Sequence, residues 1–483
     1  MLFNSLSFAV FFPVVVVLYY TLPQRYHVSL LLVASCVFYM AFVPQYILVL
    51  FTLITLDFFL AQLIEKQTGR RRAALLWTSV AGNIGMLFFF KYFNFFNINL
   101  DALADLLHWN YDPMLLYIAL PLGLSFHIFQ SLSYVIEVYR RRFKPERNYL
   151  VYALYVMFFP QLVAGPIERP AHLLPQMRQA HSFDSTKVRR GLERMLWGFF
   201  KKLVIADNLA LIVTQIYSGT PDGPLVIVAA VLFTFQIYCD FSGYSDIAVG
   251  TALVLGYDIM ENFNRPFASR SVAEFWRRWH ISLSSWLRDY VYYPLALGGK
   301  RHSRLRLYVS LFASFVLIGL WHGANWTYVV FGALNGLYVT FGSITEAARQ
   351  RAAEFVQLTR LPPLRHALKV VITFALFAFC LIFFRAPDLE HAWGWVSRLP
   401  TGDLGVVRDW FFALALPDKM RLAIALAAIG LMEAVQYWQA KRGTHYIFDR
   451  WAKPLRYAWY YALIIGILLF GYFKAQPFIY FQF

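Results

Sequence analysis

Long apolar stretches alternate with short polar ones along the whole chain. Examples of the apolar stretches are Phe3–Tyr20, Tyr46–Ile64, Leu75–Phe96 and Tyr457–Phe473. A helix needs roughly 20 apolar residues to cross the ~30 Å hydrocarbon layer of a bilayer. We count about 11 to 13 stretches of this kind by that criterion. The pattern therefore predicts an all-α, polytopic integral membrane protein.

Composition supports a membrane protein and excludes a water-soluble fold. Hydrophobic residues make up 59% of the 483 positions and charged residues only 15%, whereas soluble domains carry about 25% charged residues. The chain contains no low-complexity linker, no long polar segment and no fixed-period repeat. We therefore predict that residues 1–483 form a single membrane domain.

The formal charge of +17 falls in the gaps between apolar stretches and not in one stripe, so we do not expect a nucleic-acid partner. By the positive-inside rule the basic segments should be cytoplasmic. These segments are Arg70–Arg72, Arg140–Arg147, Lys187–Lys202, Arg349–Lys369 and Lys441–Arg456. The connections Asn97–Asp112 and Ser218–Gly223 lack Lys and Arg, so they should face outward. Parity then places the N-terminus outside.

Two segments depart from simple membrane-spanning hairpins. Leu150–Gly165 is apolar but lies between two basic stretches, which predicts a re-entrant or broken helix or, alternatively, a helix end kinked by proline. Phe275–Tyr290 is too charged to span a bilayer alone. At about 100° per residue its tryptophans share one helix face and its arginines the other. This pattern predicts an interfacial or re-entrant amphipathic helix with His280 at the border of the two faces.

His322 is the strongest candidate for chemistry because apolar sequence flanks it on both sides. An ionisable residue inside a membrane span is expensive, which makes it a functional-site hypothesis by default. A neutral imidazole can accept a proton and later return it. Neither His280 nor His322 belongs to a metal-binding spacing, and Cys36, Cys239 and Cys380 form no C-x-x-C pair. We therefore expect neither a metal nor a disulfide.

Polar residues also interrupt the apolar stretch around Asp240, Ser242, Tyr244 and Asp246. Such groups must be satisfied at membrane depth, which predicts a wet cavity facing the substrate or a packed turn stapled by the carboxylates. The basic residues that follow have the charge to bind nucleotide phosphates on the cytoplasmic side, and anionic lipid headgroups explain the same charge. They are Arg265, Arg270, Arg277, Arg278 and Lys300.

Several motifs together resemble the membrane-bound O-acyltransferase family. They are Glu274–Ser284, Trp286–Tyr290 and Leu320–Asn325, the last of which contains Trp321 and Asn325. Four further segments resemble the bacterial alginate O-acetyltransferase branch of that family. These are Asp240–Asp246, Glu261–Asn264, Ala164–Ile167 and Phe478–Phe483. The resemblance covers essentially the whole chain, whereas Tyr292–Lys300 departs from the pattern that we associate with alginate enzymes.

The resemblance implies a ring of membrane helices around a thin centre with a tunnel, in which His322 is catalytic and His280 assists it. It implies that acetyl-CoA is the cytoplasmic donor and that no cofactor is bound. The acetyl group would pass across the inner membrane of a bacterium to hydroxyls of an exported polysaccharide, through a periplasmic or membrane-anchored partner protein. The substrate-binding candidates would be Asp240, Ser242, Tyr244, Asp246, Trp321 and Asn325, together with the arginines above.

Two other readings of the sequence stay open. The same His pair would serve D-alanyl transfer to teichoic acid or acylation of a protein. In a different class, a polysaccharide or lipid transporter would also have re-entrant breaks and buried polar residues. Internal inverted symmetry would favour the transporter, and we find none in the sequence.

The predicted orientation can be tested by labelling single cysteines in intact cells. Cysteines at Asp101 and Thr220 should react with an impermeant reagent added outside, and cysteines at Thr68 and Asn148 should be protected, because Lys and Arg cluster only near the latter pair. Labelling in the opposite sense would reverse the orientation.

Overall fold

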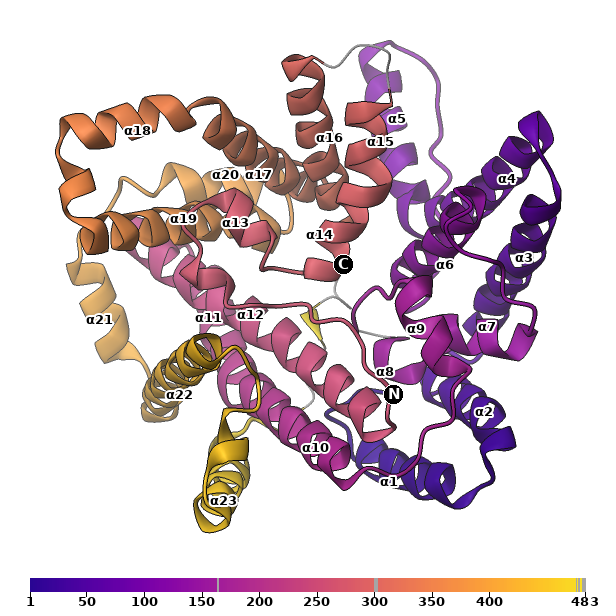
Figure 1. Ribbon diagram of the computed structural model, residues 1–483. Coiled ribbons are helices and arrows are strands. Elements are labelled where there is room, and N and C mark those ends of the chain that lie inside the picture. Colours follow the sequence, from indigo (N-terminus) through magenta and orange to yellow (C-terminus); the bar gives the residue numbers. More distant parts are fainter. Residues whose placement is uncertain (163–164, 299–302, 475, 477, 480–483) are drawn as a thin grey trace. The chain divides into compact units, whose positions relative to one another are not determined.

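The computed structural model describes residues 1–162, 165–298, 303–474, 476, 478 and 479 (Figure 1). Every regular element in this part of the chain is helical. Within the described residues, seven helical stretches are long and apolar enough to cross a membrane, which confirms a polytopic all-α membrane protein. The number of apolar stretches in the sequence is higher because several of them form shorter helices, such as α1 (Leu6–Thr21) and α2 (His27–Met40).

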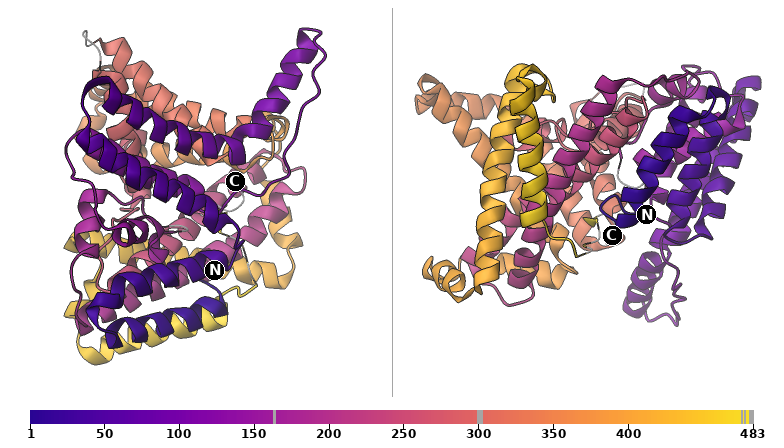
Figure 2. Two further views of the ribbon diagram at one scale, coloured as in Figure 1. Left: turned by 90° about the vertical axis from the view of Figure 1, so that its right-hand side faces the viewer. Right: turned by 90° about the horizontal axis from the view of Figure 1, so that it is seen from below.

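The chain divides into two compact units, which comprise Met1–Leu192 with Ala248–Met260, and Glu193–Ile247 with Glu261–Phe483. In the first unit, α3, α4 and α6 pack against one another (Figure 2). Besides α1 and α2, its elements are η1 (Gln24–Tyr26), α3 (Tyr46–Lys66), α4 (Gly69–Leu87), η2 (Phe88–Tyr92), α5 (Phe93–Leu106), α6 (Leu124–Tyr139), α7 (Tyr149–Met157), α8 (Phe159–Leu162) and α9 (Pro170–Met177).

The chain passes between the units within α10 (Ser185–Phe199) and α12 (Gly223–Val254). In the second unit, α22 and α23 pack against the π-helical segment η3 (Figure 2). Its elements are η3 (Phe200–Ala206), α11 (Asp207–Tyr217), η4 (Pro266–Ala268), α13 (Val272–Trp276), α14 (Ile281–Leu287), η5 (Arg288–Tyr292), α15 (Tyr293–Leu297), α16 (Arg304–His322), α17 (Trp326–Ile344), α18 (Glu346–Phe355), η6 (Leu358–Arg360), α19 (Pro362–Arg385), α20 (Leu389–Ser397), α21 (Gly405–Ala413), α22 (Leu416–Arg442), η7 (Ile447–Arg450) and α23 (Lys453–Phe470).

The predicted break after Leu150 is confirmed. Helix α7 ends at Met157, Phe158 leaves the helical conformation, and the short helix α8 carries Pro160. All residues from Val151 to Leu162 are buried, as expected for irregular backbone that the protein must shield from lipid. Ala164, which belongs to the following motif, lies outside the described residues.

The predicted amphipathic helix over Phe275–Tyr290 is wrong in one respect, because the helix is not continuous. Helix α13 ends at Trp276, and α14 begins only at Ile281. Between them His280 adopts a left-handed conformation with φ 42° and ψ 55°. The helical periodicity was a poor guide here because backbone hydrogen bonds to a distant segment, described below, replace those of a helix.

Two neighbouring helices hold His322 at the end of a close hairpin. Helices α16 and α17 approach so closely that a Cβ atom on Gly319 would lie 2.1 Å from the carbonyl oxygen of Tyr328, and one on Gly332 would lie 2.4 Å from that of Phe315. Small residues at such positions let membrane helices pack backbone against backbone. Asn325 then starts α17, because its side chain accepts a hydrogen bond from the Thr327 N–H. His322 thus lies between two apolar spans, as its flanking sequence predicted.

Candidate active site

Two backbone hydrogen bonds join the segment around His280 to residues 262–264. The carbonyl of Asn262 accepts the N–H of Ile281 at 2.9 Å, and the carbonyl of Arg278 accepts the N–H of Asn264, also at 2.9 Å. The His280 side chain is completely buried. A left-handed conformation at a non-glycine residue persists only when its surroundings enforce it, and such residues concentrate at functional sites.

The side chain of Asn262 reinforces this segment. Its Oδ1 accepts the hydroxyl of Ser282 in α14 at 2.7 Å, and its Nδ2 donates to the hydroxyl of Ser245 in α12 at 3.3 Å. Asn262, Ser245 and Ser282 are all buried. Asn262 therefore ties the turn that carries His280 to the long helix α12.

His280, Trp321 and His322 form a row of aromatic rings. The Trp321 ring centroid lies 5.9 Å from that of His280 and 5.0 Å from that of His322. Phe241 of α12 contacts His280 at 4.7 Å, and Phe384 of α19 contacts His322 at 5.1 Å. We call these three residues the His–Trp–His row. The fold thus brings together two histidines that are 42 positions apart in the sequence.

A cavity of about 460 Å³, the inner cavity, lies beside the His280 end of the row. Its lining includes Arg278 and Ile281, which flank His280 in the sequence. It also includes Phe263, which contacts Phe241, the residue whose ring packs on His280. The other lining residues are Arg194, Trp197, Lys201, Tyr238, Asp246, Glu261, Asn264, Arg265, Gln436, Gln439, Ala440, Gly443, Thr444 and His445. By the predicted topology, the loops that contribute Arg265, Arg278 and His445 face the cytoplasm.

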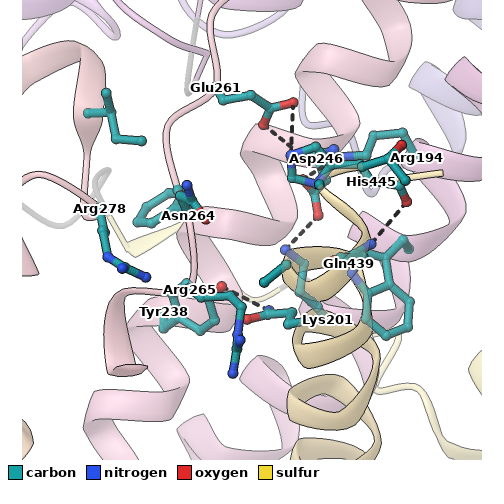
Figure 3. Close-up of a pocket in the computed structure, with 17 residues that line it drawn as sticks. Arg194, Lys201, Tyr238, Asp246, Glu261, Asn264, Arg265, Arg278, Gln439 and His445 are labelled. Carbon is teal, nitrogen blue, oxygen red and sulfur yellow. Dashed lines mark hydrogen bonds and ion pairs between the residues drawn. The ribbon is translucent and has the colours of Figure 1, made fainter. Parts of the chain in front are cut away.

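Carboxylates neutralise part of the positive charge of the inner cavity (Figure 3). Asp246 forms ion pairs with Arg194 at 2.6 Å and with Lys201 at 2.5 Å. Glu261 forms a further ion pair with Arg194 at 2.6 Å. The charge of Arg194 and burial lower the pKa of His445 to about 3, so its ring is neutral at physiological pH. The lining has four cations (Arg194, Lys201, Arg265 and Arg278) against two carboxylates, and the excess charge is positive.

A second cavity of about 440 Å³, the outer cavity, lies beside the other end of the row. Gly323, Ala324 and Asn325, which directly follow His322, line it together with Phe384, whose ring contacts His322. The other lining residues are Ala210, Thr214, Phe233, Gln236, Tyr328, Arg385, Ala386, Pro387, Gln476 and Ile479. The His–Trp–His row therefore has one cavity at each end within the second unit.

The chain resembles known proteins over most of its length. Residues 142–385 match the profile of the membrane-bound O-acyltransferase (MBOAT) family. The chain is 39% identical over 398 residues to the probable alginate O-acetylase of Pseudomonas aeruginosa, covering 81% of this chain and 74% of that protein. The chain belongs to the membrane-bound O-acyltransferase family. It is therefore an O-acyltransferase and not a transporter.

More distant relatives carry related activities in their names. The chain is 32% identical over 392 residues to the peptidoglycan O-acetyltransferase of Helicobacter pylori, covering 75% of this chain and 71% of that protein. It is 27% identical over 281 residues to the teichoic acid D-alanyltransferase of Bacillus subtilis, covering 56% and 70%.

The four predicted phosphate-binding arginines that the structure describes do not gather in one place. Arg265 and Arg278 line the inner cavity of this acyltransferase (Figure 3). Arg270 pairs with Glu274 at 3.3 Å and does not line it, and the exposed Arg277 does not line it either. Arg278 also contacts Glu274, at 2.8 Å. Lys300 lies outside the described residues.

The polar residues of α12 are helical, so the predicted packed turn is wrong. Asp240 forms an ion pair with Lys202 at 2.7 Å, and the Ser242 hydroxyl accepts a hydrogen bond from Lys201 Nζ at 2.9 Å. The Tyr244 ring stacks on Phe478 at 4.5 Å. Cations from the neighbouring segment satisfy these groups, so α12 can continue through them. Of the four predicted residues, Asp246 lines the inner cavity and the other three do not.

Lys201 and Lys202 correct a second expectation. We read them as the end of a cytoplasmic basic loop, but both are buried in η3 and ion-paired. The sequence carried a signal for this arrangement, because Arg194 and Lys201 are seven positions apart and share a helix face. Asn262 was noted only as part of the motif Glu261–Asn264 and was given no role. His445 was not identified, because it lies in a basic segment.

Replacing Asn262 with Ala tests its part in holding His280. The change removes the partner of two buried hydroxyls, which should cost about 1–3 kcal/mol of stability, and it loosens the turn at His280. We expect a lower thermal midpoint and at least about tenfold less acyl transfer per folded molecule, since displacement of catalytic groups by about 1 Å costs up to ~10²-fold. Asn110→Ala is the control, because Asn110 is exposed in the loop after α5. Full activity in Asn262→Ala would refute this role.

Proposed function

We propose that this acyltransferase moves an acetyl group from cytoplasmic acetyl-CoA to hydroxyls of an exported polysaccharide, across the inner membrane of a bacterium. A periplasmic or membrane-anchored acetyltransferase would be its partner. The observation that carries the proposal is the His–Trp–His row, which has a basic cavity at one end and a second cavity at the other. The two relatives named as O-acetylating enzymes support acetyl as the acyl group.

The charges of the inner cavity suit the donor. Arg194 and Lys201 are committed to Asp246 and Glu261, so they contribute little free charge. Arg265 makes no ion pair within the described residues, and its guanidinium lies 5.5 Å from the Tyr437 ring centroid. Arginine donors match phosphate oxygens geometrically. We assign the phosphates of acetyl-CoA to Arg265 and to Arg278, although Glu274 neutralises part of the charge of Arg278 at 2.8 Å.

The proposed reaction needs one base and no covalent acyl-enzyme. His322 accepts the proton of the acceptor hydroxyl while that oxygen attacks the thioester carbonyl. The carbon–sulfur bond then breaks, and the CoA thiolate leaves and takes up the proton that His322 releases, which returns the base to its neutral form. His280, at the donor end of the row, orients the thioester or stabilises the charge that develops on its carbonyl oxygen. The apolar rings around both histidines keep water from the thioester.

D-alanyl transfer is the second candidate, favoured by the similarity to the teichoic acid D-alanyltransferase of Bacillus subtilis. It uses the same histidines with a different acyl donor. Purified protein supplied with labelled acetyl-CoA, or with a labelled D-alanyl thioester, separates the two candidates by which label reaches a hydroxyl.

Replacement of His322 tests the proposed base. His322→Ala and His322→Gln should lower acetylation of the surface polymer by roughly 10² to 10⁴-fold, normalised to membrane-inserted protein, while protein abundance holds. His366→Gln is the matched control, because His366 is exposed at the start of α19. If His322→Ala retained near-normal acetylation at normal abundance, the proposed mechanism would be wrong.

A further inference from the structure

A groove of about 700 Å³, the outer groove, adjoins the outer cavity. Thr214, Arg385 and Pro387 line both spaces. The remaining lining residues of the outer groove are Tyr217, Ser218, Gly219, Thr220, Glu390, His391, Gly394, Trp395 and Arg398. The connection Ser218–Gly223 is predicted to face outward, so the groove would open on the side of the membrane opposite the inner cavity.

Arg385 lines both of these spaces. It is the last residue of α19, and within the described residues no carboxylate lies within ion-pair distance of it. Its guanidinium donates to the Thr214 hydroxyl at 3.4 Å and lies 6.0 Å from the Tyr217 ring centroid. By contrast, the buried cations Arg194, Lys201 and Lys202 all have carboxylate partners.

An uncompensated, partly buried charge is costly unless something pairs with it. Arg385 and Arg398 give the outer groove two cations against the single carboxylate of Glu390 among its lining residues. An anion that enters the groove would therefore be attracted to Arg385, which directly follows Phe384, the residue whose ring contacts His322.

A second polar group points to the kind of molecule that carries this anion. Gln236 of α12 lines the outer cavity, and its buried Oε1 has no hydrogen-bond partner within the described residues. An amide oxygen accepts from a hydroxyl, while its NH₂ group donates. Beside Arg385 the cavity thus offers an acceptor for hydroxyl groups and a cation for a carboxylate or phosphate. An acidic sugar carries both hydroxyl groups and a carboxylate or phosphate.

We propose that the outer groove and outer cavity bind an anionic sugar unit of the acceptor, with Arg385 holding its carboxylate or phosphate and Gln236 one of its hydroxyls. This inference rests on the proposed function, because it takes the ligand to be the polymer that receives the acyl group. It assigns to Arg385 the selection of acidic over neutral acceptors.

Binding of defined tetrasaccharides to the full-length protein in nanodiscs tests this assignment independently of catalysis. The probes are a neutral hexose tetrasaccharide, the corresponding uronate tetrasaccharide and a phosphorylated tetrasaccharide. The wild type should bind at least one acidic probe more tightly than the neutral one, and the preferred probe identifies carboxylate or phosphate as the anion. Arg385→Gln should weaken that binding by about 10- to 100-fold, because a charge-assisted hydrogen bond is lost. Arg385→Lys should restore part of it.

Arg408→Gln is the matched control, since Arg408 is an exposed arginine in α21 that pairs with Asp409 and lines neither space. It should leave binding of all three probes unchanged. Equal binding of neutral and acidic probes, or unchanged acidic binding in Arg385→Gln, would overturn the inference. Such a result would leave acetyl transfer through His322 untouched, whereas loss of acetyl transfer in the wild type with intact acidic binding would refute only the proposed function.

Discussion

The packing of α12 in the second unit depends on ion pairs that offset the free-energy cost of burying charged side chains. Two sets of ion pairs join the α10–η3 stretch to α12, with Asp246 between Arg194 and Lys201, and Asp240 bound to Lys202. Removing one partner from such a pair typically costs about 3–5 kcal/mol, because the other charge stays buried. The pairs therefore fix how α12 faces its neighbour, and α12 in turn supplies Ser245 to the segment that holds His280.

This pairing also determines which cations remain for ligands. Arg194, Lys201 and Lys202 serve the structure, whereas within the described residues no carboxylate lies within ion-pair distance of Arg265 or Arg385. Glu433 interacts with Arg265 at longer range. Arg265 lies at the inner cavity and Arg385 at the outer cavity. A membrane protein that retains unpaired arginines in cavities bears a cost that a bound anion would relieve. The proposed donor and acceptor each provide such an anion.

Much of this architecture could be predicted from the sequence, and the exceptions have physical causes. Long apolar stretches predicted the helices, and the apolar sequence on both sides of His322 predicted its place between two membrane spans. The break at His280 could not be predicted, because it depends on hydrogen bonds from Asn262 and Asn264, which are 14 or more positions away. The placement of Lys201 and Lys202 was also missed, since a basic residue resembles a loop charge until its carboxylate partner on another helix is known.

The most direct test of the account is a structure of the protein in nanodiscs with a non-hydrolysable acetyl-CoA analogue bound. We predict density for the phosphates beside Arg265 and Arg278 in the inner cavity, with the acyl end reaching the His–Trp–His row. Density for the analogue at another site, with the inner cavity empty and the acyl group remote from His280 and His322, would contradict the account.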